Sequence, residues 1–244
     1  MQFRTIFATF LISIFSLALI GCGGGGNQQP TTEEQPTPSP EETGVLQYAA
    51  KFEGDPPERR EIDASANPEC GKETILGEEV VVNDNQTLRD VVIAVQQGPS
   101  GYEVPADERL IDQENCIYRP HLTTVKAGQT VTITDSDEGM HNVRATQDGS
   151  QLFNMTTFQG DEKEVEFDKE GVVKLDCDIH PWMEAWVYVT DHGQAAVTGE
   201  DGKATLNQLP EGDYQFKAWH EEFGAKQHKE SITAEEEISI EDVF

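Results

Sequence analysis

Short segments in which apolar and polar residues alternate make up most of the chain after residue 44. Examples run from Thr130 to Asp135 and from Asp213 to His220, and glycine-containing turns such as Glu200-Asp201-Gly202 separate many of them. Alternation with a period of two places successive side chains on opposite faces of a strand. No segment has the long helical period of an amphipathic helix. The sequence therefore predicts an all-β protein made of β-sandwiches.

One loop between two of these segments carries three potential metal ligands in close succession. Its sequence is Cys177-Asp178-Ile179-His180-Pro181-Trp182-Met183, and His141 supplies a second imidazole upstream. A thiolate, two imidazoles and a weakly binding thioether are the ligands of a blue-copper electron-transfer site. Structural zinc, the main competing metal, is held by closed sets of Cys and His without a thioether. The ligand types therefore favour copper, although a lone Cys and His can also be a buried thiol and a structural imidazole.

The loop resembles that of amicyanin and its plastocyanin relatives, the small cupredoxins. The shared features are Pro181 after the ligand histidine and the aromatic Trp182 before the methionine. Residues 125–137 resemble the cupredoxin strand that leads to the first histidine ligand, and the likeness extends over about residues 117–190. The resemblance implies a cupredoxin fold, a Greek-key β-sandwich, that holds one type 1 copper ion.

The resemblance also assigns a role to each residue of the site. It makes His141, Cys177 and His180 the equatorial ligands and Met183 the axial ligand. The backbone N–H of Asn142 would donate to the Cys177 sulfur, and Asn142 and Pro181 would surround the ligands and tune the site. In small cupredoxins the loop histidine reaches the surface, so the edge of His180 would exchange electrons within an apolar collar. Trp182 in that collar would contact the redox partner.

A second region resembles the carboxypeptidase-regulatory-like or transthyretin-like β-sandwich. The resemblance rests on residues 195–206 and 209–214, each of which contains a glycine-based turn. Hairpin turns of this kind need residues that tolerate unusual backbone angles. Residues 45–57 and 88–95 fit the early strands of the same sandwich.

Because those early strands precede the copper-site region, we interpret the domain order as nested. One sandwich would be built from both ends of the chain, with the cupredoxin domain inserted, and a serial order is the alternative. The predicted boundaries are residues 45–97 and 191–244 for the carboxypeptidase-regulatory-like sandwich and residues 98–190 for the cupredoxin domain. The combination resembles the bacterial methylamine utilisation, plastocyanin-like proteins.

Residues 1–21 have the features of a bacterial lipoprotein signal peptide. A positive charge precedes a mostly apolar run at residues 5–20, and Leu19-Ile20-Gly21-Cys22 fits a lipobox. The apolar run is too short for a stable membrane span. Residues 22–44, rich in Gly, Pro, Gln, Thr and Glu, predict a flexible tether. We expect a lipid on Cys22 and a location in the bacterial cell envelope, in the periplasm or at the cell surface; an ordinary secretory signal with an incidental cysteine is the alternative.

An exported location permits disulfide bonds, and two cysteines remain once the lipidated and copper-binding ones are assigned. Pairing Cys70 with Cys116 is the economical prediction. A second metal site made of Cys116 and His121 is the alternative, but it lacks two further ligands. His121 and His220 are also candidates for a place beside the copper site, although single histidines are more often structural contacts.

The chain contains 17 basic and 46 acidic residues and has a formal net charge of −29. This charge excludes nucleic-acid binding, which needs a cationic surface. It fits the attraction of a basic redox partner, such as a cytochrome c or a dehydrogenase or oxidase. It also fits a protein that is acidic for solubility or because of a saline habitat.

The sequence predicts a lipid-anchored electron carrier rather than an enzyme. Copper enzymes of the nitrite-reductase or multicopper-oxidase type connect the blue site to a second copper centre through histidines next to the cysteine. Here Asp176 and Asp178 flank Cys177, and the chain has no His-x-His pair. A copper-binding module for delivery, storage or sensing is the alternative function, although such proteins favour open sites rich in Met or His. A sandwich that binds no metal and mediates assembly is a further alternative, which the complete ligand set disfavours.

Overall fold

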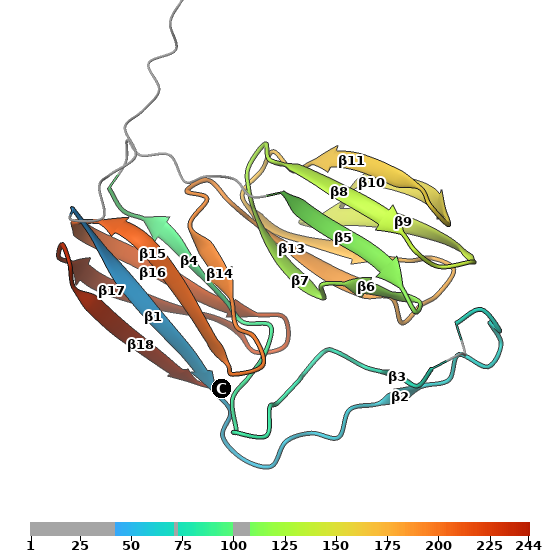
Figure 1. Ribbon diagram of the computed structural model, residues 1–244, viewed down its shortest axis with the longest axis horizontal. Helices are drawn as coiled ribbons and strands as arrows, with labels where there is room; N and C mark the ends of the chain where they lie inside the picture. The colour runs from blue at the N-terminus through green and yellow to red at the C-terminus, as the bar shows by residue number, and fades with distance from the viewer. Residues whose placement is uncertain (1–41, 71–72, 100–107) are drawn as a thin grey trace, which may run out of the picture. The chain divides into compact units, whose positions relative to one another are not determined.

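The computed structural model describes residues 42–70, 73–99 and 108–244. These residues all belong to one compact unit. They form eighteen strands and an all-β structure, which confirms the predicted fold class (Figure 1). The expected signal peptide, Cys22 and almost all of the expected tether lie outside the described residues. Within the described residues, no helix is long and apolar enough to span a bilayer.

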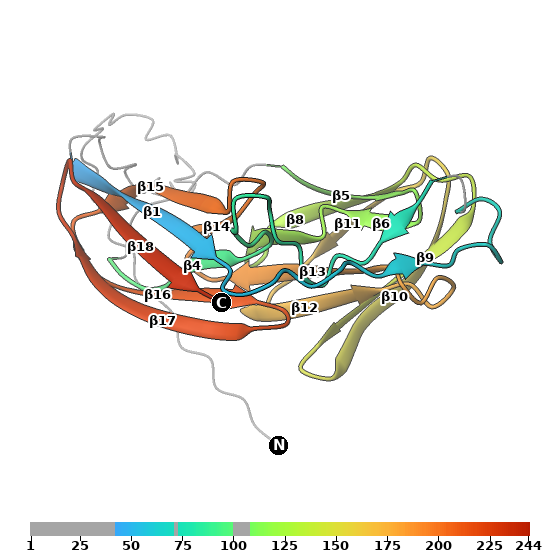
Figure 2. The ribbon, with the colours of Figure 1, turned by 90° about the horizontal axis from the view of Figure 1, so that it is seen from below.

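Residues 109–190 form a β-sandwich of two sheets around one apolar core, here called the first sandwich (Figures 1 and 2). The five-stranded sheet has the order β10 (Ser150–Phe158), β9 (Met140–Gln147), β12 (Gly171–Asp176), β13 (Glu184–Thr190), β7 (Leu122–Lys126). The four-stranded sheet has the order β11 (Glu162–Glu166), β8 (Thr130–Asp135), β5 (Arg109–Glu114), β6 (Ile117–Arg119). Alternate residues of both sheets, among them Val131, Leu175 and Val187, are fully buried between them. This burial is what the period-two pattern predicts.

Strands from both ends of the described chain form the second sandwich. One sheet has the order β15 (Lys203–Pro210), β1 (Thr43–Lys51), β18 (Glu237–Val243). The other has the order β14 (Ala195–Val197), β4 (Val92–Gln97), β16 (Gly212–His220), β17 (Gly224–Ile232). Their shared core includes Leu46, Ile93 and Phe216. Strands β1 and β4 thus pair with strands that follow the first sandwich in sequence. The nested order, the domain boundaries and the carboxypeptidase-regulatory-like resemblance stay predictions.

The middle of the chain between β1 and β4 packs against the first sandwich, whereas its two ends pack in the core of the second sandwich. It contains two short strands that pair with each other, β2 (Glu61–Ile62) and β3 (Ile75–Leu76). Ala64, Cys70 and Ile75 from this segment are buried in the core of the first sandwich. Cys70 forms a disulfide with Cys116, which lies in the turn between β5 and β6. The predicted disulfide is therefore confirmed, and it ties this segment to the first sandwich.

Candidate metal centre

The candidate metal centre lies where the loop from β12 to β13 meets the start of β9. Strands β12 and β13 are antiparallel neighbours, so their ends bring Cys177 and Met183 close together. The Cys177 N–H donates to the Met183 carbonyl at 3.1 Å, and the Met183 N–H donates to the His180 carbonyl at 2.9 Å. His141 is the second residue of β9, which pairs with the other edge of β12. The sheet and its loop therefore bring together the residues that the sequence predicts as ligands.

Three potential donor atoms converge at this point. The Nδ1 atoms of His141 and His180 are 2.9 Å apart, and Cys177 Sγ is 3.8 Å from His180 Nδ1. All three donor atoms lie within 4.8 Å of one another. The residues themselves are buried, with exposed fractions of 0% for His141, 3% for Cys177 and 1% for His180, and Met183 is buried in the same core cluster. Two imidazole nitrogens and one sulfur at these separations can bind a single metal ion, and the donor types fit copper.

Hydrogen bonds inside the cluster prepare the cysteine for metal binding. Burial disfavours a charged His141, but its hydrogen bonds to Asp137 and Cys177 outweigh burial and raise its pKa to about 9. Burial also disfavours the Cys177 thiolate, yet hydrogen bonds from His141 and from the Asn142 backbone N–H lower the pKa of the thiol. Burial and the neighbouring charge of His141 lower the pKa of His180. The cluster therefore favours the thiolate, which is the form of cysteine that binds metals.

Asp137 orients His141, a role that no motif in the sequence indicates. Its Oδ2 atom is 3.1 Å from His141 Nε2, the ring nitrogen that does not face His180. The carboxylate also accepts hydrogen bonds from the backbone N–H groups of Asn115 and Cys116, each at 2.8 Å. A carboxylate on the outer nitrogen of a metal-ligating histidine fixes the orientation of the ring. The signal available in the sequence was the acidic stretch Asp135-Ser136-Asp137 just before the ligand strand.

Asn142 holds the ligand loop against β9 and β10. Its Oδ1 accepts a hydrogen bond from the Asp178 N–H at 2.8 Å and lies 3.5 Å from Cys177 Sγ. Its Nδ2 donates to Asp178 Oδ2 at 3.1 Å and to Asn154 Oδ1 at 2.9 Å. Arg144 in β9 donates to the same aspartate at 2.8 Å. The side chain of Asn142, as well as its backbone N–H, thus acts on the surroundings of the Cys177 sulfur.

His180 is buried, which corrects the expectation that its edge reaches the surface. Cys70 Sγ lies 3.4 Å from His180 Nε2, and the Trp182 ring packs against the imidazole with centroids 5.3 Å apart. Trp182 is partly exposed and donates from Nε1 to the Cys116 carbonyl at 3.0 Å, while Pro181 is exposed. The expectation was wrong because the covering residue Cys70 comes from a segment 110 residues away in sequence.

The other histidines considered as candidates do not join the cluster. His121 is hydrogen-bonded through Nε2 to Glu221, and the His220 Nδ1 accepts a hydrogen bond from the Glu222 N–H at 3.1 Å. Cys116 cannot form a second metal site with His121, because its sulfur is in the disulfide. Among the described residues, each other close group of three potential metal ligands includes a disulfide cysteine.

Several solved structures similar to this chain are cupredoxins. The purple cupredoxin from Nitrosopumilus maritimus is 30% identical over 34% of this chain and 100% of its own, with a TM-score of 0.32. Amicyanin from Paracoccus versutus is 24% identical over 40% of this chain and 97% of its own, also with a TM-score of 0.32. A copper-containing nitrite reductase from Thermus scotoductus SA-01 is 20% identical over 40% of this chain but only 25% of the enzyme, with the same TM-score.

No protein-family model matches the chain, and no curated protein matches it. The likenesses to solved structures cover 34% to 40% of this chain.

Proposed function

We propose that this protein is a type 1 copper protein that carries single electrons. The observation that carries the proposal is the convergence of two imidazole Nδ1 atoms and one thiol sulfur in a buried cluster. His141, Cys177 and His180 would hold the ion, and Met183 would be the weak axial ligand. Copper supplies the redox chemistry, because it exists as Cu(I) and Cu(II), which differ by one electron.

The contribution of the protein is to keep the ligands in place and to exclude water. Asp137 orients one imidazole, and Asn142 restrains the loop that carries the thiol. The exposed fractions of the three converging residues do not exceed 3%. A site that rearranges little suits an electron carrier, whereas delivery, storage or sensing of copper would be better served by an open site. The absence of enzymatic activity is part of this proposal, since Asp176 and Asp178 occupy the positions where histidines would connect Cys177 to a second copper.

The test is a copper titration of the full-length protein followed by visible spectroscopy. The proposal expects an intense thiolate-to-copper band that saturates at one copper per chain and bleaches reversibly on reduction by one electron. The reduced protein should also keep its copper in the presence of a chelator. A colourless copper complex would contradict ligation by the thiolate, and release of copper on reduction would favour a role in delivery.

The proposed setting of this electron carrier is outside the cytoplasm, with a lipid on Cys22 as the membrane anchor. The lipobox sequence supports the anchor, and the net charge of −29 supports a basic partner, such as a cytochrome c, attracted at long range. A Cys22→Ser precursor should lose both fatty-acid labelling and membrane association, because the acyl chains provide the anchor. If the variant still pellets with membranes after a carbonate wash, the uncleaved apolar segment holds the protein instead.

A further inference from the structure

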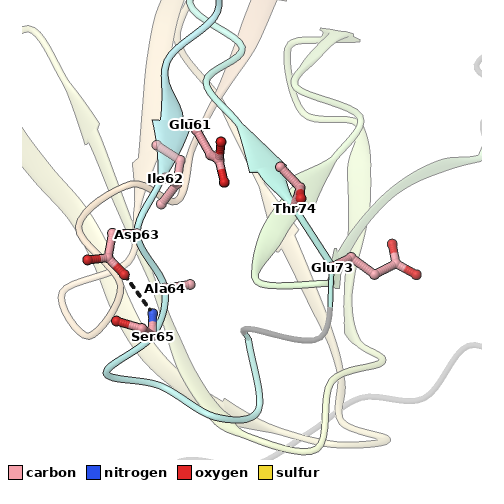
Figure 3. A pocket seen from close by; sticks show the side chains of 7 residues that line it. All are labelled: Glu61, Ile62, Asp63, Ala64, Ser65, Glu73 and Thr74. Carbon is pink, nitrogen blue, oxygen red and sulfur yellow. Dashed lines mark hydrogen bonds between the residues drawn. The ribbon is translucent and has the colours of Figure 1, made fainter.

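Residues 61–70, here called the cover, are docked on the first sandwich by one face. Figure 3 draws side chains from the first half of the cover, where two apolar residues alternate with three polar ones: Ile62 and Ala64, and Glu61, Asp63 and Ser65. Ala64 is buried and Ile62 packs against the core of the first sandwich, whereas the polar residues are exposed. The Asp63 Oδ1 accepts a hydrogen bond from the Ser65 N–H at 3.0 Å, which shapes the turn that follows. The cover is therefore an amphipathic segment with a defined inner face.

The inner end of the cover meets the candidate copper site. Cys70 Sγ lies 3.4 Å from His180 Nε2, while Nδ1 of the same ring faces His141. The exposed fractions of Cys70 and Cys116 are 2% and 0%. The side of His180 that faces away from the donor atoms is thus covered by a disulfide rather than by solvent.

The turn that carries the other half of the disulfide is linked to the second histidine. Asn115 and Cys116 both have a φ of +56°, in the left-handed region that cysteine rarely adopts. Their N–H groups donate to Asp137, whose carboxylate also contacts His141. One hydrogen-bond network therefore joins the disulfide turn to the site.

We propose that the Cys70–Cys116 disulfide is a positioning element of the copper site, which holds the cover over His180 and so controls access to the metal. The inference rests on the proposed function for the identity of the metal, whereas the burial of His180 does not depend on it. Without the disulfide the cover keeps the apolar contacts of Ile62 and Ala64 and the short pairing of β2 with β3, but its inner end at Cys70 loses its covalent link and opens far more often. Chelators and redox partners then reach His180 directly.

The test measures the carbethoxylation of histidines by diethyl pyrocarbonate in the metal-free, full-length protein, mapped by mass spectrometry. In the wild type His180 should react far more slowly than the partly exposed His192 and His228, which serve as internal references. In the double variant Cys70→Ser/Cys116→Ser the rate at His180 should rise on the order of a hundredfold. A wild-type His180 that reacts as fast as His228, or an unchanged rate in the folded double variant, would overturn the proposal.

Two further variants separate opening of the cover from a general loss of stability. Cys70→Ser/Cys116→Gly removes the same disulfide but puts glycine at the left-handed position, so that the turn is retained if the serine pair does not fold. Leu206→Ala weakens the core of the second sandwich and should leave His180 protected. If His180 is labelled equally fast in the Leu206→Ala and disulfide-free variants, a general loss of folding stability explains the faster labelling. That result would contradict the proposal.

The copper-loaded proteins provide the second readout. Removal of copper by a chelator should be faster without the disulfide by a similar factor, because the same opening limits both reactions. If the wild type forms no coloured copper complex, the proposed function fails while the labelling result stands. If copper binds as proposed but the labelling and the chelation rate do not change, the role of the disulfide fails while the proposed function stands.

Discussion

Each sandwich contains a histidine paired with a carboxylate, but only one pair belongs to a cluster of metal donors. In the first sandwich His141 Nε2 is 3.1 Å from Asp137, and in the second His228 Nε2 is 3.0 Å from Asp242. The two histidines differ in solvent exposure: His141 is fully buried, whereas the His228 side chain is 20% exposed. The other ring nitrogen of His141 faces His180 Nδ1 at 2.9 Å.

The carboxylate of the second pair, Asp242, has a tyrosine rather than a metal donor as its other partner. It accepts a hydrogen bond from the Tyr48 hydroxyl at 3.0 Å. Burial, and then the charge of Asp242, raise the pKa of Tyr48, so the phenol stays neutral and is a poor metal ligand. The two pairs therefore differ in one respect that matters for the proposed metal site: thiol and imidazole donors converge only beside the ring of His141. The following predictions test this contrast.

The largest effect on the proposed copper site is expected from Cys177→Ser. In the proposed site the thiolate would be the donor that gives the copper its colour, so the intense visible band should disappear completely. The fold should persist, because the core of the first sandwich is built mainly from other side chains. Visible absorption and circular dichroism of the copper-treated variant check both statements, and a retained intense band would show that Cys177 is not a ligand.

A smaller effect is expected from Asp137→Asn, with Asp242→Asn as the matched control. Loss of the carboxylate that orients His141 should weaken copper binding by about 10–100-fold, as is typical of residues that hold metal-ligating histidines. The control variant loses the equivalent carboxylate of the second sandwich and should bind copper as the wild type does. Competition titrations with a chelator give both affinities, and equal losses in the two variants would remove the distinction between the pairs.

Met183→Gln should keep the copper and shift the reduction potential. The harder amide oxygen stabilises Cu(II) relative to Cu(I), so the potential should fall. Voltammetry of the copper-loaded variant measures the shift. An unchanged potential would mean that Met183 is not bound, and the exposed Met140 next to His141 would become the axial candidate.

The smallest effect is expected from Tyr48→Phe in the second sandwich. It removes one buried hydrogen bond to a carboxylate that keeps His228 as a partner, so the free energy of unfolding should fall by about 1–2 kcal/mol. The visible spectrum of the copper-loaded protein should not change. Chemical denaturation and absorption spectroscopy test the two halves of this prediction, and an altered spectrum would connect the second pair to the metal.

Features that depend on residues close together along the chain could be predicted from the sequence. Alternation with a period of two gives the strands, and the spacing of Cys177, His180 and Met183 places three potential ligands in one loop. The disulfide also followed, because few cysteines were left to pair. Each of these inferences needs only local periodicity, donor chemistry or counting.

The missed features depend on contacts between distant segments. The burial of His180 requires the cover, and no local pattern states that Cys70 would lie against a residue 110 positions later. The role of Asp137 depends on the turn at Cys116, whose N–H groups share its carboxylate with His141. A sequence motif identifies the donors, but the packing that covers and orients them is a property of the whole fold.

The central claim is that one copper ion binds between the two Nδ1 atoms and the sulfur of the first sandwich. X-ray absorption spectroscopy at the copper edge of the fully loaded, full-length protein measures those ligands directly. The account predicts one short copper–sulfur bond and two imidazole nitrogens for both oxidised and reduced protein, with little change between them. A spectrum with only nitrogen and oxygen ligands, or with two short copper–sulfur bonds, would contradict it.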